Sequence, residues 1–222
     1  MAVFDADEAR HLHVLRKKEG ELLNFTDGKG NLYKGRISSM QRNMCFVEIS
    51  ESIADYHPKP YKLHIAIAPT KNMDRLEWFL EKATEIGVTL IIPIVCKHSE
   101  REKLRLDRLE GILISSMKQS LQTYLPKLYP LQSFNEFISS WQEYSGSRGI
   151  AYCGDEESPF ISVLKNVDND YLICIGPEGD FSASEVELAI ANGFMALSLG
   201  KNRLRTETAG VFAAATIAAW HY

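Results

Sequence analysis

Apolar and polar positions follow two different rhythms along the chain. From residue 19 to residue 50, short apolar pieces alternate with turn signals such as Asp27-Gly28 and Gly30-Asn31. Strands of this spacing are typical of a small β-barrel. Residues 7–20 precede them with a short helical pattern that ends in a basic corner. Residues 56–62 contain two prolines and predict a linker. We therefore expect a small β-domain over residues 1–60 and a second domain over residues 61–222.

The second region alternates strands with helices. Continuous apolar runs at 63–69, 88–96, 149–154, 171–176 and 195–200 predict strands. Helical patterns occupy 73–87, 104–122, 134–144, 184–192 and the apolar C-terminal segment, and a shorter helix is expected within 158–167. In the helix at 73–87, Leu76, Phe79, Leu80, Ala83 and Ile86 form one stripe that Gly87 closes. Strands this apolar are buried on both faces, which predicts an α/β fold with a parallel sheet.

Composition limits the functional classes. The 222 residues carry a formal net charge of −4, so the chain does not coat nucleic acid by bulk charge, although local basic patches stay open. Four widely spaced cysteines form no C-x-x-C pair, and the histidines form no H-E-x-x-H cluster, so we expect neither a metal site nor disulfides. The acidic first ten residues are unlike a signal peptide, and no apolar run has the length of a membrane span. A reduced, cytoplasmic protein is expected.

The first candidate for chemistry is the loop Gly176-Pro177-Glu178-Gly179, which follows a buried strand. Glycines let the backbone approach a ligand and adopt positive φ, and proline stiffens the loop. The pattern Ser182-x-x-Glu185 then predicts a capping box at the next helix. The loop alone fits equally well a tight turn with a solvated Glu178.

The second candidate is the segment 197–210, which leads from a strand into the last helix. Apolar Leu204 lies between Arg203 and Arg205, and Thr206-Glu207-Thr208 follow. A cationic loop with a threonine helix cap explains Thr206 but not Leu204. The first helix of the domain adds Lys71, Arg75, Lys82 and Glu85, which are most simply a solvated face.

Three segments, "KATEIGV", "IGPEGDFSASE" and "LSLGKNRLRTETA", occur in this order and resemble the signature of the ribosomal RNA small-subunit methyltransferase E family, which belongs to the SPOUT class. The segments "HLHVLRKKEGE" and "HSER" are also similar to motifs of that family, so the resemblance covers essentially the whole chain. It implies an N-terminal PUA-like barrel and a parallel sheet with a deep trefoil knot, an exception to unknotted topology. It further implies a homodimer that uses S-adenosylmethionine to methylate N3 of a uridine in the 16S rRNA of the small ribosomal subunit.

The resemblance also implies the site residues. Arg205 is the expected electrostatic group for charge that spreads over the uracil oxygens, and Glu178 and Glu207 are candidates to accept the N3 proton. The expected cofactor-binding residues are backbone and apolar groups: Gly176, Glu178, Gly179, Leu197, Leu199, Gly200, Leu204 and Thr206. The expected RNA-binding residues are mostly basic: His11, Arg16, Lys17, Lys18, His98, Arg101 and Gln119. Their clusters also include His13, Lys97, Lys103 and Arg105. Charge runs are usually solvated faces, and acidic residues are interleaved in the second cluster, but the resemblance to a family that acts on RNA favours phosphate contact.

One departure from the family limits this transfer. Many relatives carry Gln-Ser-Gly-Arg where this chain has Gln119, Ser120, Leu121 and Gln122. An RNA-contacting or catalytic role of that arginine is therefore not carried over to this chain. The apolar last helix fits burial in the monomer or a subunit interface. Alternatives are a SPOUT enzyme that methylates another position of rRNA or tRNA, including a ribose 2′-OH, and a non-catalytic RNA-binding assembly factor. A hydride-transfer enzyme is disfavoured because no strand is followed by G-x-G-x-x-G.

Overall fold

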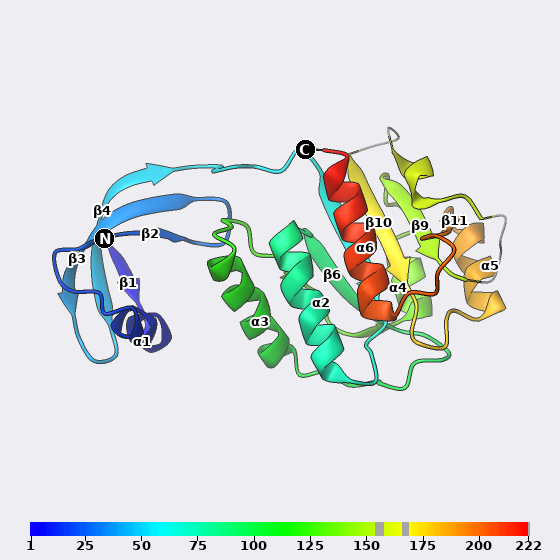
Figure 1. Ribbon diagram of the computed structural model, residues 1–222, viewed down its shortest axis with the longest axis horizontal. Coiled ribbons are helices and arrows are strands. Elements are labelled where there is room, and N and C mark those ends of the chain that lie inside the picture. The colour runs from blue at the N-terminus through cyan, green and yellow to red at the C-terminus, as the bar shows by residue number, and fades with distance from the viewer. Residues whose placement is uncertain (154–157, 166–168, 222) are drawn as a thin grey trace. The chain divides into compact units, whose positions relative to one another are not determined.

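The computed structural model describes residues 1–153, 158–165 and 169–221. The chain divides into two compact units, Met1–Pro58 and Lys59–Tyr222, and each is described separately (Figure 1). The expected roles of the two domains, RNA binding for the first and cofactor binding with dimerisation for the second, stay predictions.

The N-terminal unit is a four-stranded antiparallel sheet with one helix. Its elements are β1 (Ala2–Phe4), α1 (Ala6–Val14), β2 (Leu22–Thr26), β3 (Leu32–Met40) and β4 (Cys45–Ile53), and the strand order is β1-β4-β3-β2. The side chain of Asp5 caps α1 by accepting from the amides of Asp7 and Glu8. A small core of Ala9, Leu12, Ile37, Cys45 and Val47 joins helix and sheet. The predicted helix and the strands after residue 19 are confirmed, and closure of this sheet into a barrel stays a prediction.

The C-terminal unit is a parallel sheet covered on both faces, as predicted. The strand order is β11-β9-β10-β5-β6-β7, and β8 also pairs with β6. The strands are β5 (Lys62–Ile67), β6 (Leu90–Val95), β7 (Lys127–Leu128), β8 (Gln132–Ser133), β9 (Ser147–Ala151), β10 (Asp170–Ile175) and β11 (Met195–Leu197). The helices are α2 (Met73–Ile86), α3 (Leu106–Gln119), α4 (Phe134–Ser140), η1 (Ile161–Leu164), α5 (Ala183–Ala191) and α6 (Thr206–Ala219). The predicted element ends at residues 154, 166–167 and 222 lie outside the described residues.

Side chains alternate between the two faces of the sheet and so build two cores. On β5, Leu63, Ile65 and Ile67 pack with α2, α3 and α6, whereas Ala66, and Ala68 just after the strand, belong to the core formed with α4 and α5. Figure 1 shows α2, α3 and α6 side by side on one face. Each fully buried aliphatic or aromatic side chain contributes about 1.5–3 kcal/mol, which makes this sheet the rigid frame for the loops at its ends.

The α2 stripe shows how a sequence pattern becomes packing. Leu76, Phe79, Leu80 and Ala83 are buried as predicted, and Gly87 ends the helix with φ of 100°. At the contact with α6, a Cβ added to Gly210 would lie 2.5 Å from the Phe79 ring. Glycine at position 210 therefore lets α6 approach α2 closely. The predicted trefoil knot stays a prediction.

Candidate functional site

Loops from the carboxyl ends of the parallel strands are tied to one another by hydrogen bonds. We call the loops after β5, β6, β9, β10 and β11 the carboxyl-end loops. Arg101, after β6, donates to the backbone carbonyls of Thr70 and Lys71, after β5, at 3.3 and 2.8 Å. The amide of Lys71 in turn donates to Oε1 of Glu178, after β10, at 3.0 Å. Three loops distant in sequence are thus held together at the edge where open α/β sheets bind ligands.

The loop Gly176-Pro177-Glu178-Gly179 occupies the centre of this arrangement. The predicted capping box is present, because the Ser182 and Glu185 side chains reciprocally bond the start of α5. Glu185 also accepts from the amide of Lys97 at 2.8 Å. A Cβ on Gly176 would meet the Phe181 ring at 3.0 Å, and one on Gly179 would meet the Cβ of His98 at 2.9 Å. A side chain at position 179 would therefore force a shift of His98, and one at position 176 would be crowded by Phe181.

The loop before α6 joins the same arrangement through a buried hydrogen bond. The Thr206 hydroxyl donates to the carbonyl of Gly176 at 3.0 Å. Leu197 is fully buried, Leu199 and Leu204 are partly buried, and Gly200 has φ of 116° with no atom within 4 Å of an added Cβ. The predicted Gly176 and Leu204–Thr206 segments, about thirty residues apart in sequence, are thereby neighbours.

The three predicted catalytic side chains have different environments. Arg205 is the exposed residue before the first turn of α6. Glu178 is exposed, with one carboxylate oxygen held by the Lys71 amide. Glu207 is buried, its side chain only 8% exposed. Its Oε1 lies 3.8 Å from Nε of Arg75, and its Oε2 has no hydrogen-bond partner among the described residues.

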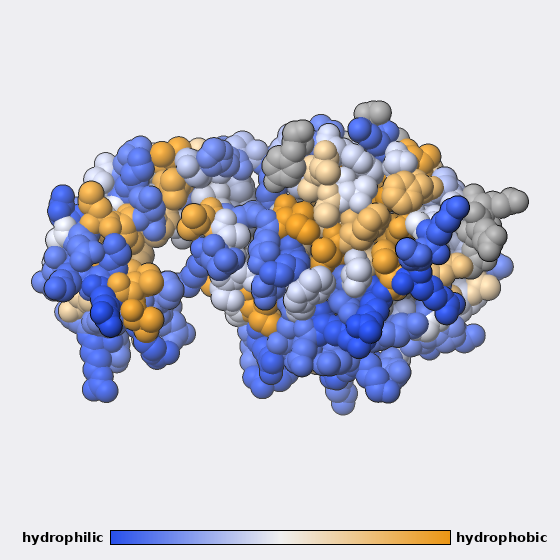
Figure 2. Space-filling model, in the orientation of Figure 1, coloured by the Kyte–Doolittle hydropathy of each residue, from blue (hydrophilic) through white to orange (hydrophobic). Residues whose placement is uncertain are grey.

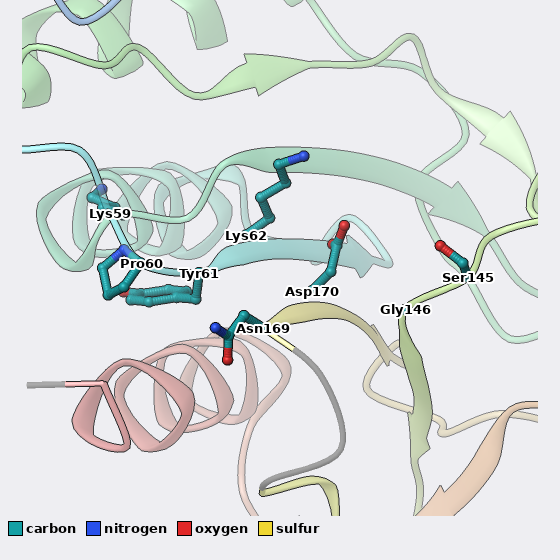
Figure 3. A pocket seen from close by; sticks show the side chains of 8 residues that line it. All are labelled: Lys59, Pro60, Tyr61, Lys62, Ser145, Gly146, Asn169 and Asp170. Atoms are coloured by element: carbon teal, nitrogen blue, oxygen red, sulfur yellow. The ribbon is translucent and has the colours of Figure 1, made fainter. Parts of the chain in front are cut away.

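A separate pocket of 330 Å³ lies at the opposite, amino end of the sheet, beside the first residues of β5, β9 and β10. Its lining includes Lys59, Lys62, Asn169 and Asp170. In Figure 3 the side chains of Lys62 and Asp170 extend to one side, whereas Asn169 points to the other. The lining side chains do not converge, and none of the predicted site residues lines this pocket.

Comparison with known proteins identifies the family. Residues 57–218 match the model of the RNA methyltransferase domain, and residues 4–50 match the RNA methyltransferase PUA domain. The chain belongs to the RNA methyltransferase family. It is similar in structure to a probable rRNA-methyltransferase from Porphyromonas gingivalis, with 41% identity, a TM-score of 0.90 and coverage of 99% of this chain and 93% of the other.

Two further relatives carry a more specific name. A ribosomal RNA small subunit methyltransferase E from Neisseria gonorrhoeae, solved bound to S-adenosyl methionine, is 27% identical with a TM-score of 0.86, over 97% of this chain and 90% of the other. The ribosomal RNA small subunit methyltransferase E of Bacillus subtilis is 26% identical over 95% of this chain and 87% of its own length.

Two of the residues expected to bind RNA in this RNA methyltransferase have partners inside the protein. Both Arg101 bonds are to backbone carbonyls, and Nδ1 of His98 donates to the carbonyl of Asp180 at 3.0 Å. Gln119 is the last residue of α3, which runs from the loop after β6 back toward the start of β7. It therefore lies toward the amino end of the strands, at the opposite end of the sheet from the carboxyl-end loops. Of the three, His98 and Gln119 are exposed.

In the N-terminal unit, the other predicted RNA-binding residues lie on and after α1. Arg16 has φ of 55°, and the bonds from the Arg16 amide to His13 and from the Lys17 amide to Leu12 form a Schellman motif without glycine. Lys17 pairs with Glu21 at 3.1 Å. His11, Arg16 and Lys18 are exposed.

Sequence reasoning missed several contacts of this RNA methyltransferase. Arg75 and Lys82 were expected on a solvated face, but Arg75 lies beside Glu207 and Lys82 bridges Glu81 and Glu85. No local pattern announces a pair between residues 75 and 207. Among the described residues, no group of three or more His, Cys, Asp or Glu could hold a metal ion, and no helix is long and apolar enough to cross a membrane.

Proposed function

We propose that the protein transfers a methyl group from S-adenosylmethionine to N3 of a specific uridine in the 16S rRNA of the small ribosomal subunit. The hydrogen bond between Thr206 and Gly176 carries the proposal, because it unites the two loops whose sequences resemble the family signature. The relatives named for this activity and the solved relative bound to S-adenosyl methionine support it. A ribosomal substrate would place the protein in the cytoplasm.

The carboxyl-end loops fit the cofactor. Leu199 and Leu204 offer apolar surface for an adenine, whereas the side chain of Leu197 is buried in the core and supports the strand end. The backbone of Gly176, Gly179 and Gly200 can approach a ligand closely. The open space beside Gly200 is room that a side chain would fill. S-adenosylmethionine supplies an electrophilic methyl group on a sulfonium centre.

Arg205, Glu207 and Glu178 provide the chemistry of the acceptor. Uridine N3 carries a proton that must leave before or during attack, and a positioned carboxylate accepts it. Glu207 has an oxygen without a hydrogen-bond partner among the described residues, whereas one oxygen of Glu178 holds the Lys71 amide. Arg205, being exposed at the end of the loop, stabilises negative charge on the uracil oxygens. We rank Arg205 above the carboxylates, since the folded rRNA can itself favour ionisation of the base.

Separate variants test the two carboxylates. Glu207→Gln and Glu178→Gln remove the proton acceptor while keeping the side-chain volume. The acceptor is the residue whose glutamine variant loses methyl transfer about 10²-fold or more while S-adenosylmethionine still binds. If both variants kept nearly the wild-type rate of methyl transfer, neither carboxylate would be the proton acceptor.

Basic residues of the N-terminal unit are assigned to RNA. His11, Arg16 and Lys18 are exposed and close in sequence, which suits phosphate contacts. The net charge of −4 suits docking on a shaped ribonucleoprotein better than gripping any polyanion. His98 and Gln119 are weaker candidates from the other unit, and Arg101 acts mainly on the Thr70–Lys71 backbone.

A homodimer completes the proposal. Phe160, Val163 and Phe212 are 37–42% exposed, and the rings of Phe160 and Phe212 lie 6.3 Å apart. Figure 2 shows apolar residues gathered over the region of α6. An exposed apolar patch on a helix that is apolar all round suits a two-fold interface. Sedimentation should therefore show a dimer, and a fully active stable monomer would refute this part.

The decisive experiment uses labelled S-adenosylmethionine and small ribosomal subunits that lack the modification, with the product nucleoside mapped by mass spectrometry. A single 3-methyluridine near the 3′ end of 16S rRNA is the expected result. Methyl transfer to another position would support methyltransferase activity but contradict the proposed target nucleotide. Absence of both transfer and cofactor binding would favour a non-catalytic RNA-binding factor.

A further inference from the structure

Asp180 adopts a backbone conformation that few residues with side chains adopt. Its φ is 63°, in the left-handed region that glycine occupies most readily and that aspartate tolerates better than most residues. It directly follows Gly179 and precedes Phe181, where the Gly-Pro-Glu-Gly loop turns toward α5. A conformation of this kind persists when the surrounding contacts hold it.

Four hydrogen bonds hold Asp180 in place. Its amide donates to the carbonyl of Pro177 at 2.9 Å, and its carbonyl accepts from Nδ1 of His98 at 3.0 Å. One carboxylate oxygen accepts from the amide of Phe181 at 2.8 Å, and the other accepts from the amide of Cys153 at 2.9 Å. Both oxygens of the carboxylate thus hold backbone amides, one in its own loop and one in the loop after β9.

The contacts of Asp180 join three of the carboxyl-end loops. His98 belongs to the loop after β6, Cys153 to the loop after β9, and Asp180 itself to the loop after β10. Among the described residues, the bonds of Glu178 to Lys71 and of Gly176 to Thr206 each reach one neighbouring loop, whereas those of Asp180 reach two.

We propose that Asp180 is a positioning residue that sets the cofactor-binding conformation of the Gly-Pro-Glu-Gly loop by fixing it to the loops after β6 and β9. This rests on the proposed function, since it takes residues 176–179 as part of the S-adenosylmethionine site. Asp180 acts through Gly176 and Gly179, whose backbones approach the cofactor, and does not itself touch the reacting atoms.

Three substitutions separate the side-chain bonds from the backbone conformation. Asp180→Gly keeps the left-handed backbone available and removes both carboxylate bonds. Asp180→Ala removes the same bonds and also penalises positive φ. Asp180→Asn tolerates the same φ but has only one acceptor oxygen, so it can serve either Phe181 or Cys153 and not both. Glu187→Gln is the matched charge control, because Glu187 is exposed on α5.

Calorimetric binding of S-adenosylmethionine, with thermal unfolding of each variant, tests the proposal. Loss of two charge-assisted bonds should raise Kd about tenfold or more in Asp180→Gly, with a smaller rise in Asp180→Asn and none in Glu187→Gln. Asp180→Ala should bind no better than Asp180→Gly and melt at a lower temperature. A residue that only stabilised the fold would lower the melting temperature and leave Kd unchanged in the folded glycine variant.

The outcomes distinguish this proposal from the proposed function. If the wild-type chain binds S-adenosylmethionine and folded Asp180→Gly and Asp180→Asn bind it equally well, the role of Asp180 is refuted and the function stands. If the wild-type chain binds no S-adenosylmethionine, the cofactor site and the role of Asp180 both fail. A graded rise in Kd from Asn to Gly supports both.

Discussion

The two ends of the parallel sheet are built differently. At the carboxyl end, side chains such as Arg101, Glu178 and Thr206 bond backbone groups of neighbouring loops. At the amino end, an open pocket lies beside Lys59, whose amino group donates to the side chain of Gln122. The pocket by itself would point to the amino end as the site. The chemistry selects the carboxyl end, because binding loops need a backbone held in one conformation before the ligand arrives.

Of the substitutions that test this difference between the two ends, Arg205→Ala should have the largest effect, on the rate of methyl transfer. Removing a cation that stabilises developing charge lowers methyl transfer by roughly 10²- to 10³-fold, while folding and cofactor binding persist because Arg205 is exposed. Single-turnover transfer to small ribosomal subunits measures it. Lys201→Ala, at another exposed cation of the same loop, is the control and should keep nearly full activity. An unchanged rate in Arg205→Ala would remove this arginine from the mechanism.

At the amino end, we expect the titration of Lys59 to make the folding stability depend on pH. Burial lowers the pKa of Lys59 to about 8 from an ordinary value of 10.5. The folded state therefore releases this proton before the unfolded state does, so stability rises as pH increases from about 8 to about 10.5. The rise amounts to at most about 3 kcal/mol. It is absent below pH 8, where the charged amine is buried at a cost.

Urea unfolding between pH 7 and pH 10.5 measures this effect of Lys59. Lys59→Met should lose the rise, and Lys62→Met should keep it, because Lys62 is an exposed lysine that lines the same pocket. Methyl transfer by Lys59→Met should stay within about twofold of the wild type if the amino end is not part of the site. Parallel pH curves for the wild type and Lys59→Met would contradict the lowered pKa.

Thr206→Val sharpens the comparison at the carboxyl end. The change keeps the side-chain shape but leaves the buried carbonyl of Gly176 without the Thr206 hydroxyl. It should destabilise the protein by about 1–2 kcal/mol, or about 2–8 °C in melting temperature, and weaken S-adenosylmethionine binding. Thr216→Val is the matched control, since the Thr216 hydroxyl bonds only within α6. Equal melting temperatures for the two variants would count against the Thr206 tie.

The smallest expected effect is at Leu121. Its φ is 56° and its side chain is 86% exposed, at the position after α3 where a Schellman motif favours glycine. Leu121→Gly should therefore stabilise the protein by about 0.5–1 kcal/mol without changing methyl transfer. Leu125→Gly, at an exposed residue outside the left-handed region, should bring no gain. If Leu121→Gly were destabilised, the extra conformational entropy of glycine in the unfolded state would outweigh the strain relieved at positive φ.

The departure from the family at Leu121 and Gln122 has a structural account. Leu121 adopts a left-handed conformation that glycine would adopt at lower cost. Gln122 occupies the place of the usual arginine and is bonded on both sides, since it accepts from Lys59 at 2.8 Å and donates to the carbonyl of Glu85 at 2.6 Å. A cation thus stands beside position 122 although the residue there is neutral.

Local sequence was sufficient where neighbours in the chain decide the structure. Hydrophobic periodicity predicted α2 and the parallel strands, because each kind of element has its own side-chain period. The Ser182-x-x-Glu185 spacing predicted the capping box, because residues three apart meet within one helical turn. β1 was missed, since three residues carry no readable period. The resemblance supplied the family and the order of the loops.

Only the tertiary structure decided which loops meet. The pair Arg75–Glu207, the bonds from Arg101 to residues 70 and 71, and the bond from Cys153 to Asp180 join residues 27 to 132 positions apart. No periodicity encodes such pairs, because they depend on the strand order that brings β5, β6, β9 and β10 to one edge. The sequence by itself thus determined the elements and the family. The sheet determined the site, since side chains can bond only where packing places them within reach.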